Sequence, residues 1–437
     1  MMKLSTRDVV RVTMVITVTC LAADPALVIY GQESLHGSLF GTLWKLWQMP
    51  LIAVIMLQTR HPLRILKPLV PLLPWFLWML LATYANGFDI EALKGLFDVT
   101  IPYIAACFMA SWLCSENGIA DFRRALWIAF WTIVSLAFAL AFSGLQPYPG
   151  TTDPQPGAPP IYFVGVGNPI AFVALCACLV ALTVAERHRY SVRNVVLRLA
   201  IIFIPCTLAL YRAALGGLAL IVIMSIIGPL LGLVFGRTMK TWDVRYMAAL
   251  SVSCVLGIAI LFPLVATKMF NANGGLNFSG REHAWPVYIE AAKDNSYLGL
   301  GPNGDLKVGR THAELTGIGA AHSDYLMLVL SFGIPGLVLW LSGIASLVWR
   351  ALARATPSFD PAVRAAAIYS LSALFVTMIV ENIIRGSSTG WMYLIFPLLH
   401  SFYVDRQDAA YSAPLHAIEN MRLPKLVVQS DTVENSS

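Results

Sequence analysis

Three polar side chains outside the long apolar stretches could act together on a phosphate-bearing donor. They are Arg212, Arg281 and His322. A guanidinium donates paired hydrogen bonds whose geometry matches phosphate oxygens. A neutral imidazole can take the proton of an attacking hydroxyl group. These residue types therefore suit a reaction in which a hydroxyl displaces a phosphate-bearing leaving group.

Arg281 follows a helix-start signal. Ser279-Gly280-Arg281-Glu282 fits the capping-box pattern and predicts a helix from there to about Asp294, kinked at Pro286. Arg281 would then lie in the first turn, beside unpaired backbone N–H groups and the positive end of the helix dipole. Such a position attracts phosphate. The alternative is an ordinary solvated charge on an amphipathic loop helix.

The other polar candidates also have structural alternatives. Arg212 has no acidic residue within 20 positions on either side, but it could extend to lipid headgroups as a membrane-edge arginine. Arg385 could pair with its neighbour Glu381. His322 opens a long apolar run, and a histidine at a helix end often has only a structural role. Its position at the end of the one long polar insertion favours a chemical role.

Other motif matches predict little chemistry. Residues 299–304 fit GxGxxG, but no strand precedes them, so we expect a turn-rich linker that can approach a ligand closely. No HxxE, DxD or HExxH pattern occurs in the predicted outer segments, and we expect neither a metal site nor a cofactor. The seven cysteines lie in apolar stretches without CxxC spacing, as small buried hydrophobic residues do.

The composition predicts a polytopic membrane protein. Of the 437 residues, 57% are hydrophobic and 12% are charged, and the mean hydropathy is +0.69. A soluble domain averages about 25% charged residues. The net charge of +6 reflects the loops of such a protein, and we expect the lipid bilayer, not nucleic acid, as its partner.

The apolar stretches predict an all-α domain of about twelve transmembrane helices over residues 1–404. A membrane-spanning helix needs about 20 mainly apolar residues. The first stretch resembles a signal peptide, but its length and the many spans that follow favour a retained helix. We divide residues 195–235 at Tyr211-Arg212, because an arginine at mid-bilayer is costly. The predicted spans are 9–30, 38–58, 68–86, 97–115, 125–145, 161–185, 195–211, 213–235, 245–267, 321–349, 364–383 and 388–404.

The distribution of basic residues predicts the orientation. With both termini in the cytoplasm, 21 of the 30 Lys and Arg residues lie at cytoplasmic helix ends, as the positive-inside rule requires. Residues 269–320, between the ninth and tenth spans, then form a large periplasmic loop. Residues 405–437 form a polar cytoplasmic tail, which we expect to be loosely ordered.

Residues 160–400 resemble the bacterial O-antigen ligases, within the wider O-antigen ligase and polymerase superfamily. The resemblance lies in the order of several features along the chain. They are an outward arginine between two spans, a long outer loop before the third-last span, Ser279-Gly280-Arg281 with Trp285 after it, the Gly-rich 298–302, and His322-Ser323-Asp324-Tyr325-Leu326 at the next helix. The family often has Ser-Arg-Gly where this chain has Tyr211-Arg212-Ala213.

The resemblance implies a membrane glycosyltransferase, similar to the GT-C class, in the bacterial inner membrane. It would transfer polysaccharide from undecaprenyl pyrophosphate to a sugar hydroxyl of lipid A–core on the periplasmic side. Arg212 and Arg281 would bind the pyrophosphate and His322 would be the catalytic base, with Tyr211, Trp285 and Arg385 as further candidates. The alternatives are an O-antigen polymerase, a protein-glycosylating oligosaccharyltransferase, or a transporter of an anionic lipid-linked glycan.

Overall fold

The computed structural model describes residues 6–23, 48–59, 62–115, 117–142, 169–208, 212–234, 242–250, 252–253, 281–316, 320–353, 361–380, 384 and 390–421. Every regular element that it describes is a helix, which confirms the predicted all-α class. The elements are α1 (Thr6–Ala23), α4 (Gln48–Gln58), α5 (Pro62–Ile65), η2 (Lys67–Leu72), α6 (Leu73–Ala85), α7 (Ile90–Leu113), α8 (Gly118–Phe142), α9 (Pro169–Ala185), η3 (Arg187–Arg189), α10 (Val192–Leu208), α11 (Arg212–Val234), α13 (Arg281–Asp294), α14 (Gly304–Thr311), α15 (Ala313–Thr316), α16 (Asp324–Ala353), α17 (Pro361–Val380) and α18 (Gly390–Met421).

Within the described residues, five helices are long and apolar enough to cross a bilayer. They are Lys67–Ala85, Ile90–Leu113, Gly118–Ala139, Asp324–Arg350 and Pro361–Ile379. Shorter apolar helices cover Gln48–Leu57, Phe172–Ala185 and Leu215–Leu230. Large apolar side chains such as Leu77, Trp131 and Val338 are exposed on the outer faces of α6, α8 and α16. This apolar exterior is the surface that a membrane-embedded protein presents to lipid.

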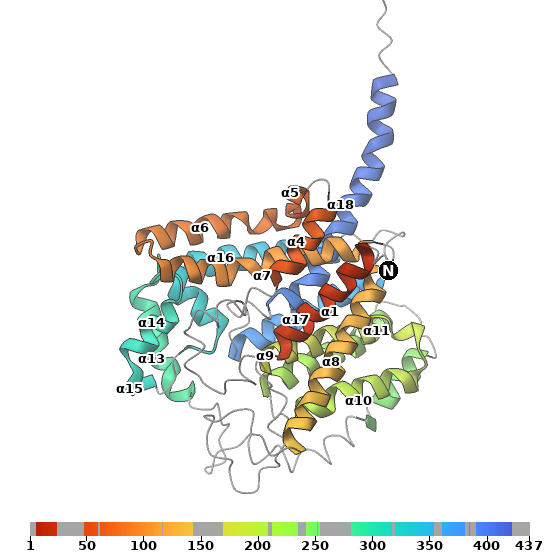
Figure 1. Ribbon diagram of the computed structural model, residues 1–437, viewed down its shortest axis with the longest axis horizontal. Coiled ribbons are helices and arrows are strands. Elements are labelled where there is room, and N and C mark those ends of the chain that lie inside the picture. Colours follow the sequence, from red (N-terminus) through yellow and green to blue (C-terminus); the bar gives the residue numbers. More distant parts are fainter. Residues whose placement is uncertain are drawn as a thin grey trace, which may run out of the picture.

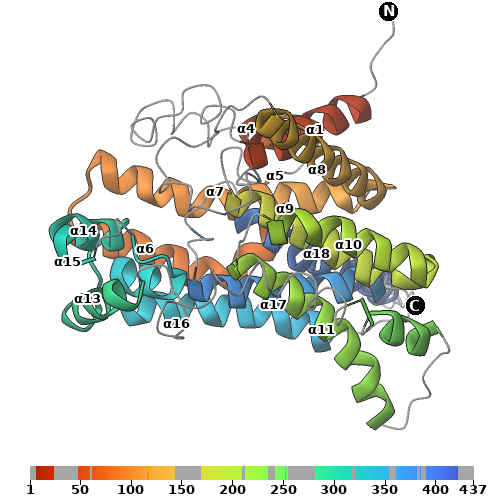
Figure 2. The same ribbon diagram turned by 90° about the horizontal axis from the view of Figure 1, so that it is seen from below.

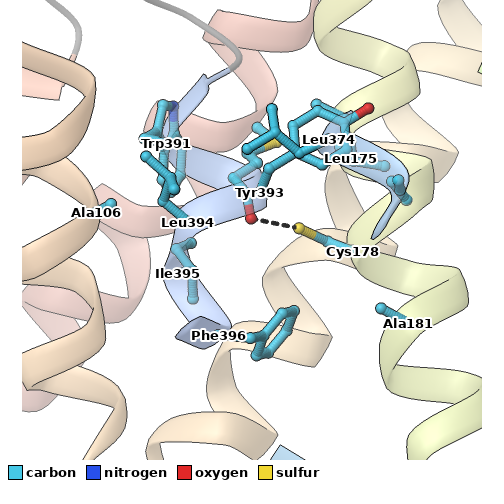
Figure 3. Close-up of a cluster of buried hydrophobic side chains, with 14 of the residues drawn as sticks. Ala106, Leu175, Cys178, Ala181, Leu374, Trp391, Tyr393, Leu394, Ile395 and Phe396 are labelled. Carbon is cyan, nitrogen blue, oxygen red and sulfur yellow. Dashed lines mark hydrogen bonds between the residues drawn. The ribbon is translucent and has the colours of Figure 1, made fainter. Parts of the chain in front are cut away.

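The centre of the helix bundle is formed by α9 and the first half of α18. Both helices are apolar on all sides, and such helices are buried. Residues 172–184 of α9 and 391–401 of α18 are almost entirely shielded. Figure 3 shows Trp391–Phe396 packed against Cys178 of α9, with Ala106 and Leu374 of neighbouring helices around them. The Cys178 thiol donates to the Met392 carbonyl at 3.2 Å.

The helices run between two ends of the molecule. The loop end carries α13, α14 and α15, which both views place together at the left (Figures 1 and 2). Gly95, near the start of α7, packs against Pro302 at this end. Because α7 runs away from it, α8 begins at the opposite end, where Arg123 pairs with Glu186 at the end of α9. We call this opposite end, with the first turns of α8 and α10, the arginine end.

Two predicted features are present as expected. The loop helix α13 covers Arg281–Asp294, with Pro286 inside it. The proposed capping residue Ser279 lies outside the described residues. The stretch that was divided at Tyr211-Arg212 forms two helices, and the second, α11, begins at Arg212.

Two details differ from the prediction. The predicted span 321–349 is interrupted at Gly333, where φ is 71° and ψ is 177°. The last helix does not end near residue 404, because α18 continues through Met421. The expectation of a loosely ordered segment directly after Asp405 is therefore wrong. The added residues 405–421 contain no glycine and several good helix formers, but Pro414 lies inside them and costs about 3 kcal/mol, so local propensity alone does not explain the longer helix.

Candidate active site

The loop end has a small hydrophobic core of its own. Ala284, Tyr288 and Ala292 recur at four-residue spacing on α13, so they lie on one face of that helix. This face packs with Val308 of α14 and with two residues near the start of α16, Ala321 and Leu330. The residues of the loop are therefore fixed on α16.

The interruption of α16 at Gly333 provides the backbone groups that hold the loop. The Leu330 carbonyl accepts from Leu300 N–H at 2.7 Å, and Ile334 N–H donates to the Ser296 carbonyl at 2.7 Å. In an unbroken helix, Ile334 N–H would bond to the Leu330 carbonyl. The kink thus exchanges one helical hydrogen bond for two bonds to the loop. The indole N–H of Trp78 on α6 donates a hydrogen bond to the Phe332 carbonyl, just before the kink, at 2.7 Å.

Two of the three glycines in the GxGxxG segment, Gly299 and Gly304, pack against backbone, and Gly301 packs against the Asn86 side chain. A Cβ atom on Gly299 would lie 2.5 Å from the Ser331 carbonyl carbon, and one on Gly304 would lie 2.3 Å from the Leu330 oxygen. The Ser331 hydroxyl accepts from Gly304 N–H at 3.1 Å. Gly299 and Gly304 therefore allow the segment to pack closely on α16. The predicted close approach of this segment to a ligand stays a prediction.

His322 has a backbone conformation that residues with a Cβ atom seldom adopt. Its φ is 47°, in the left-handed region, which costs about 1–2 kcal/mol for an L-residue. Such a conformation persists only where the surrounding structure imposes it, and it is concentrated at functional sites. The side chain is half-buried. The contacts on both sides of His322 explain how the conformation is maintained.

The residue before His322 is held by the two loop helices. The Ala321 carbonyl accepts from the indole N–H of Trp285 on α13 at 2.8 Å. Its N–H donates to the carboxylate of Asp305 on α14 at 3.4 Å. Ala321 and Asp305 are both fully buried, so the bond between them is shielded from bulk water, whereas the bond from Trp285 is partly buried.

The residues after His322 are held from the side of α17. The Asp324 carboxylate accepts from Ile384 N–H at 2.9 Å, and the Tyr325 hydroxyl donates to the Phe375 carbonyl at 3.1 Å. Ser323 adds a long hydrogen bond of 3.5 Å to the Met378 carbonyl. The His322 backbone is therefore fixed between α13 and α14 on one side and the α17 end on the other.

Arg281 lies on the same helix as the indole that holds this segment. It precedes Trp285 by four residues, so the two side chains share one face of α13. Trp285 in turn contacts the residue next to His322. The fold thus brings Arg281, Trp285 and His322 into one region of the loop end. Arg281 is half-buried.

The other described cations of the loop are either engaged locally or fully exposed. Lys293 pairs with Glu290 at 2.8 Å, and this hydrogen bond raises the pKa of the Lys293 ammonium. Lys307 donates to the Leu300 carbonyl at 2.7 Å, and Arg310 is exposed on α14. Arg281 differs from them in being half-buried in the first turn of α13, a position that suits a bound anion.

The first residue of α11, Arg212, is placed at the same end of the bundle. Gly217 of α11 packs against Thr377 of the antiparallel α17, next to the Met378 carbonyl that contacts Ser323. Arg212 lies five residues from Gly217 toward the loop end, about 7.5 Å along the helix axis. Its side chain, together with Tyr211 and Arg385, lies outside the described residues.

Sequence reasoning missed the carboxylates that position the histidine. Asp305 and Asp324 are fully buried, and each accepts a backbone N–H from another segment. One signal was available, because acidic residues within or beside long apolar runs are costly and need partners. The identity of those partners depends on the tertiary fold.

In the part of the chain that the structure describes, no three His, Cys, Asp or Glu side chains are grouped so that they could hold a metal ion. The expectation of a reaction without metal or cofactor stays a prediction. Neither a scan against protein-family models nor a search of curated proteins finds a match to this chain. These two comparisons therefore indicate no function for the residues around His322.

Proposed function

We propose that this protein is a membrane glycosyltransferase of the O-antigen ligase type. It has about twelve spans in the bacterial inner membrane, both termini in the cytoplasm and the loop end in the periplasm. Its donor is a polysaccharide on undecaprenyl pyrophosphate, and its acceptor is a sugar hydroxyl of lipid A–core. The proposal rests on the sequence resemblance together with the arrangement around His322.

One observation carries the proposal most strongly. His322 is held in a left-handed conformation by contacts from three helices, next to the face of α13 that carries Arg281. A left-handed backbone is uncommon outside glycine and is concentrated at functional sites, so it favours a chemical role for His322. A base that must meet an acceptor hydroxyl requires a fixed position, because proton transfer needs hydrogen-bond distance.

The proposed reaction follows from these groups. The acceptor oxygen forms a bond to the anomeric carbon of the donor sugar as the bond from that carbon to the pyrophosphate oxygen breaks. His322 takes the proton of the acceptor hydroxyl. The pyrophosphate leaves with the bonding electron pair, and Arg281 and Arg212 stabilise its growing negative charge. The bilayer holds both lipid-linked substrates at one surface, which reduces the entropy cost of bringing them together.

Replacing Arg281 by alanine is expected to weaken donor binding by about tenfold or more, because a lost charge-assisted hydrogen bond costs about 1.5–3 kcal/mol. Lysine should restore only part of the affinity, since it lacks the two-pronged geometry of arginine. The measurement is equilibrium binding of undecaprenyl-pyrophosphate-linked glycan to purified protein in lipid nanodiscs.

Arg310→Ala is the matched control, because it removes the same charge from an exposed position at the loop end. It should bind the donor almost as the wild type does. The melting temperature of each variant shows whether the loop remains docked. If Arg281→Ala melted normally and bound the donor with wild-type affinity, Arg281 would be an ordinary solvated charge.

A further inference from the structure

A cavity of about 270 Å³ lies at the arginine end, away from His322. It is lined by Arg123, Arg124, Trp127 and Ile128 of α8 and by Arg198 of α10. Both helices pack against α9, and the cavity lies between them. Three arginines around one small cavity would repel each other unless negative charge balances them.

The protein itself balances only part of this charge. Arg123 pairs with the buried carboxylate of Glu186 and donates to the Tyr190 hydroxyl at 3.0 Å. Glu186 is shared, because Arg189 also pairs with it at 3.0 Å. Arg123, Arg189 and Glu186 together therefore carry a net positive charge, and the two other cavity arginines add to it.

Arg124 and Arg198 have no carboxylate partner among the described residues. Arg124 is exposed, and the Arg198 guanidinium is positioned 4.1 Å above the centre of the Tyr190 ring. This cation–π contact orients the guanidinium but leaves its charge uncompensated. Both side chains can therefore turn their N–H groups toward an anion in the cavity.

The surfaces beside the cavity are apolar and exposed. Ile128 and Trp131 of α8 are 50% and 49% exposed, and Leu197 of α10 is 56% exposed. Trp127 lies one turn beyond Arg123, and tryptophan next to arginine is typical of the membrane–water interface. The cavity thus has a cationic part and opens beside surfaces that suit hydrocarbon chains.

We propose that this cavity binds the headgroup of an anionic phospholipid from the leaflet at the arginine end. Arg124 and Arg198 contact the phosphate, and the acyl chains lie along Ile128, Trp131 and Leu197. The volume suits a small headgroup, because about 270 Å³ is just below the roughly 300–1,000 Å³ of pockets for drug-sized ligands. This inference does not depend on the proposed glycosyl transfer.

The test is native mass spectrometry of the purified full-length protein after delipidation and addition of one phospholipid at a time. The wild type should retain one molecule of phosphatidylglycerol more strongly than phosphatidylcholine. The double variant Arg124→Gln, Arg198→Gln should retain less phosphatidylglycerol, by about tenfold or more, because it loses two charge-assisted contacts. The matched control is Arg64→Gln, Arg193→Gln, which removes two exposed arginines that do not line the cavity.

Equal retention of phosphatidylglycerol by the two double variants would overturn the proposal, as would equal retention of both lipids by the wild type. Displacement of the lipid by millimolar inorganic phosphate would show that the site binds soluble phosphate and would overturn the lipid assignment.

A second measurement, the salt dependence of lipid retention, needs no variant. Wild-type retention should fall as salt is raised toward about 0.5 M, where exposed charges are screened, and retention that does not change with salt would contradict a headgroup held by arginines.

Discussion

Replacing His322 by alanine is expected to lower the rate of glycan transfer by about 10²–10⁴-fold, the usual contribution of a general base. Donor affinity should stay within about threefold of the wild type, because Arg281 and Arg212 remain in place. The rate is measured with purified protein, lipid-linked donor and lipid A–core acceptor, and the affinity by equilibrium binding.

The left-handed backbone of His322 provides a sharper control than alanine alone. Glycine adopts a φ of 47° without strain, and asparagine tolerates it better than most residues. His322→Gly and His322→Asn therefore preserve the backbone but remove the proton acceptor. All three variants should be similarly inactive. If the glycine or asparagine variant transferred glycan at the wild-type rate, the role of position 322 would be conformational.

Replacing Gly333 by alanine is expected to lower both stability and activity. A Cβ atom at this position would lie 1.9 Å from the Tyr297 carbonyl oxygen, so the loop segment or α16 must move. Its backbone angles also fall in a region that is almost exclusive to glycine, with a cost of about 1–3 kcal/mol. The displacement would break the hydrogen bond from Ile334 N–H to the Ser296 carbonyl. We expect a lower melting temperature and faster hydrogen exchange over residues 296–316.

Gly228→Ala is the control for this substitution. Gly228 lies inside α11, and a Cβ atom there would meet nothing within 4 Å. Alanine should be neutral or slightly stabilising at that position, because it has the higher helix propensity. A Gly333→Ala protein that melted and transferred glycan as the Gly228→Ala protein does would show that the kink is not needed to dock the loop.

The features that the sequence predicted well have local causes. The capping-box pattern Ser279-Gly280-Arg281-Glu282 was sufficient to predict α13, whose described residues are Arg281–Asp294. The cost of an arginine in hydrocarbon was sufficient to predict two helices in this stretch, the second of which begins at Arg212. The apolar composition was sufficient to predict that the elements the structure describes are helices, and that several of them are long and apolar enough to cross a membrane.

The features that escaped prediction depend on contacts between distant segments. Gly333 and Pro335 are local signals for a break in the apolar run 324–353. Nothing local shows that Ser296 and Leu300 stabilise this kink. The left-handed angle of His322 likewise results from Trp285, Asp305 and the end of α17. Such pairings are fixed by the packing of the helices, which periodicity and composition do not specify.

The most direct test of the central claim is a transfer assay with the purified protein in sealed vesicles. The donor and lipid A–core acceptor are placed in the leaflet that faces the loop end, and the linkage between glycan and acceptor is measured together with released undecaprenyl pyrophosphate. The proposed function predicts one released lipid pyrophosphate for each glycan joined to the acceptor, and a rate of product formation about 10²–10⁴-fold lower with His322→Ala. Movement of intact donor across the bilayer, with no glycan joined to the acceptor, would contradict it and identify a transporter.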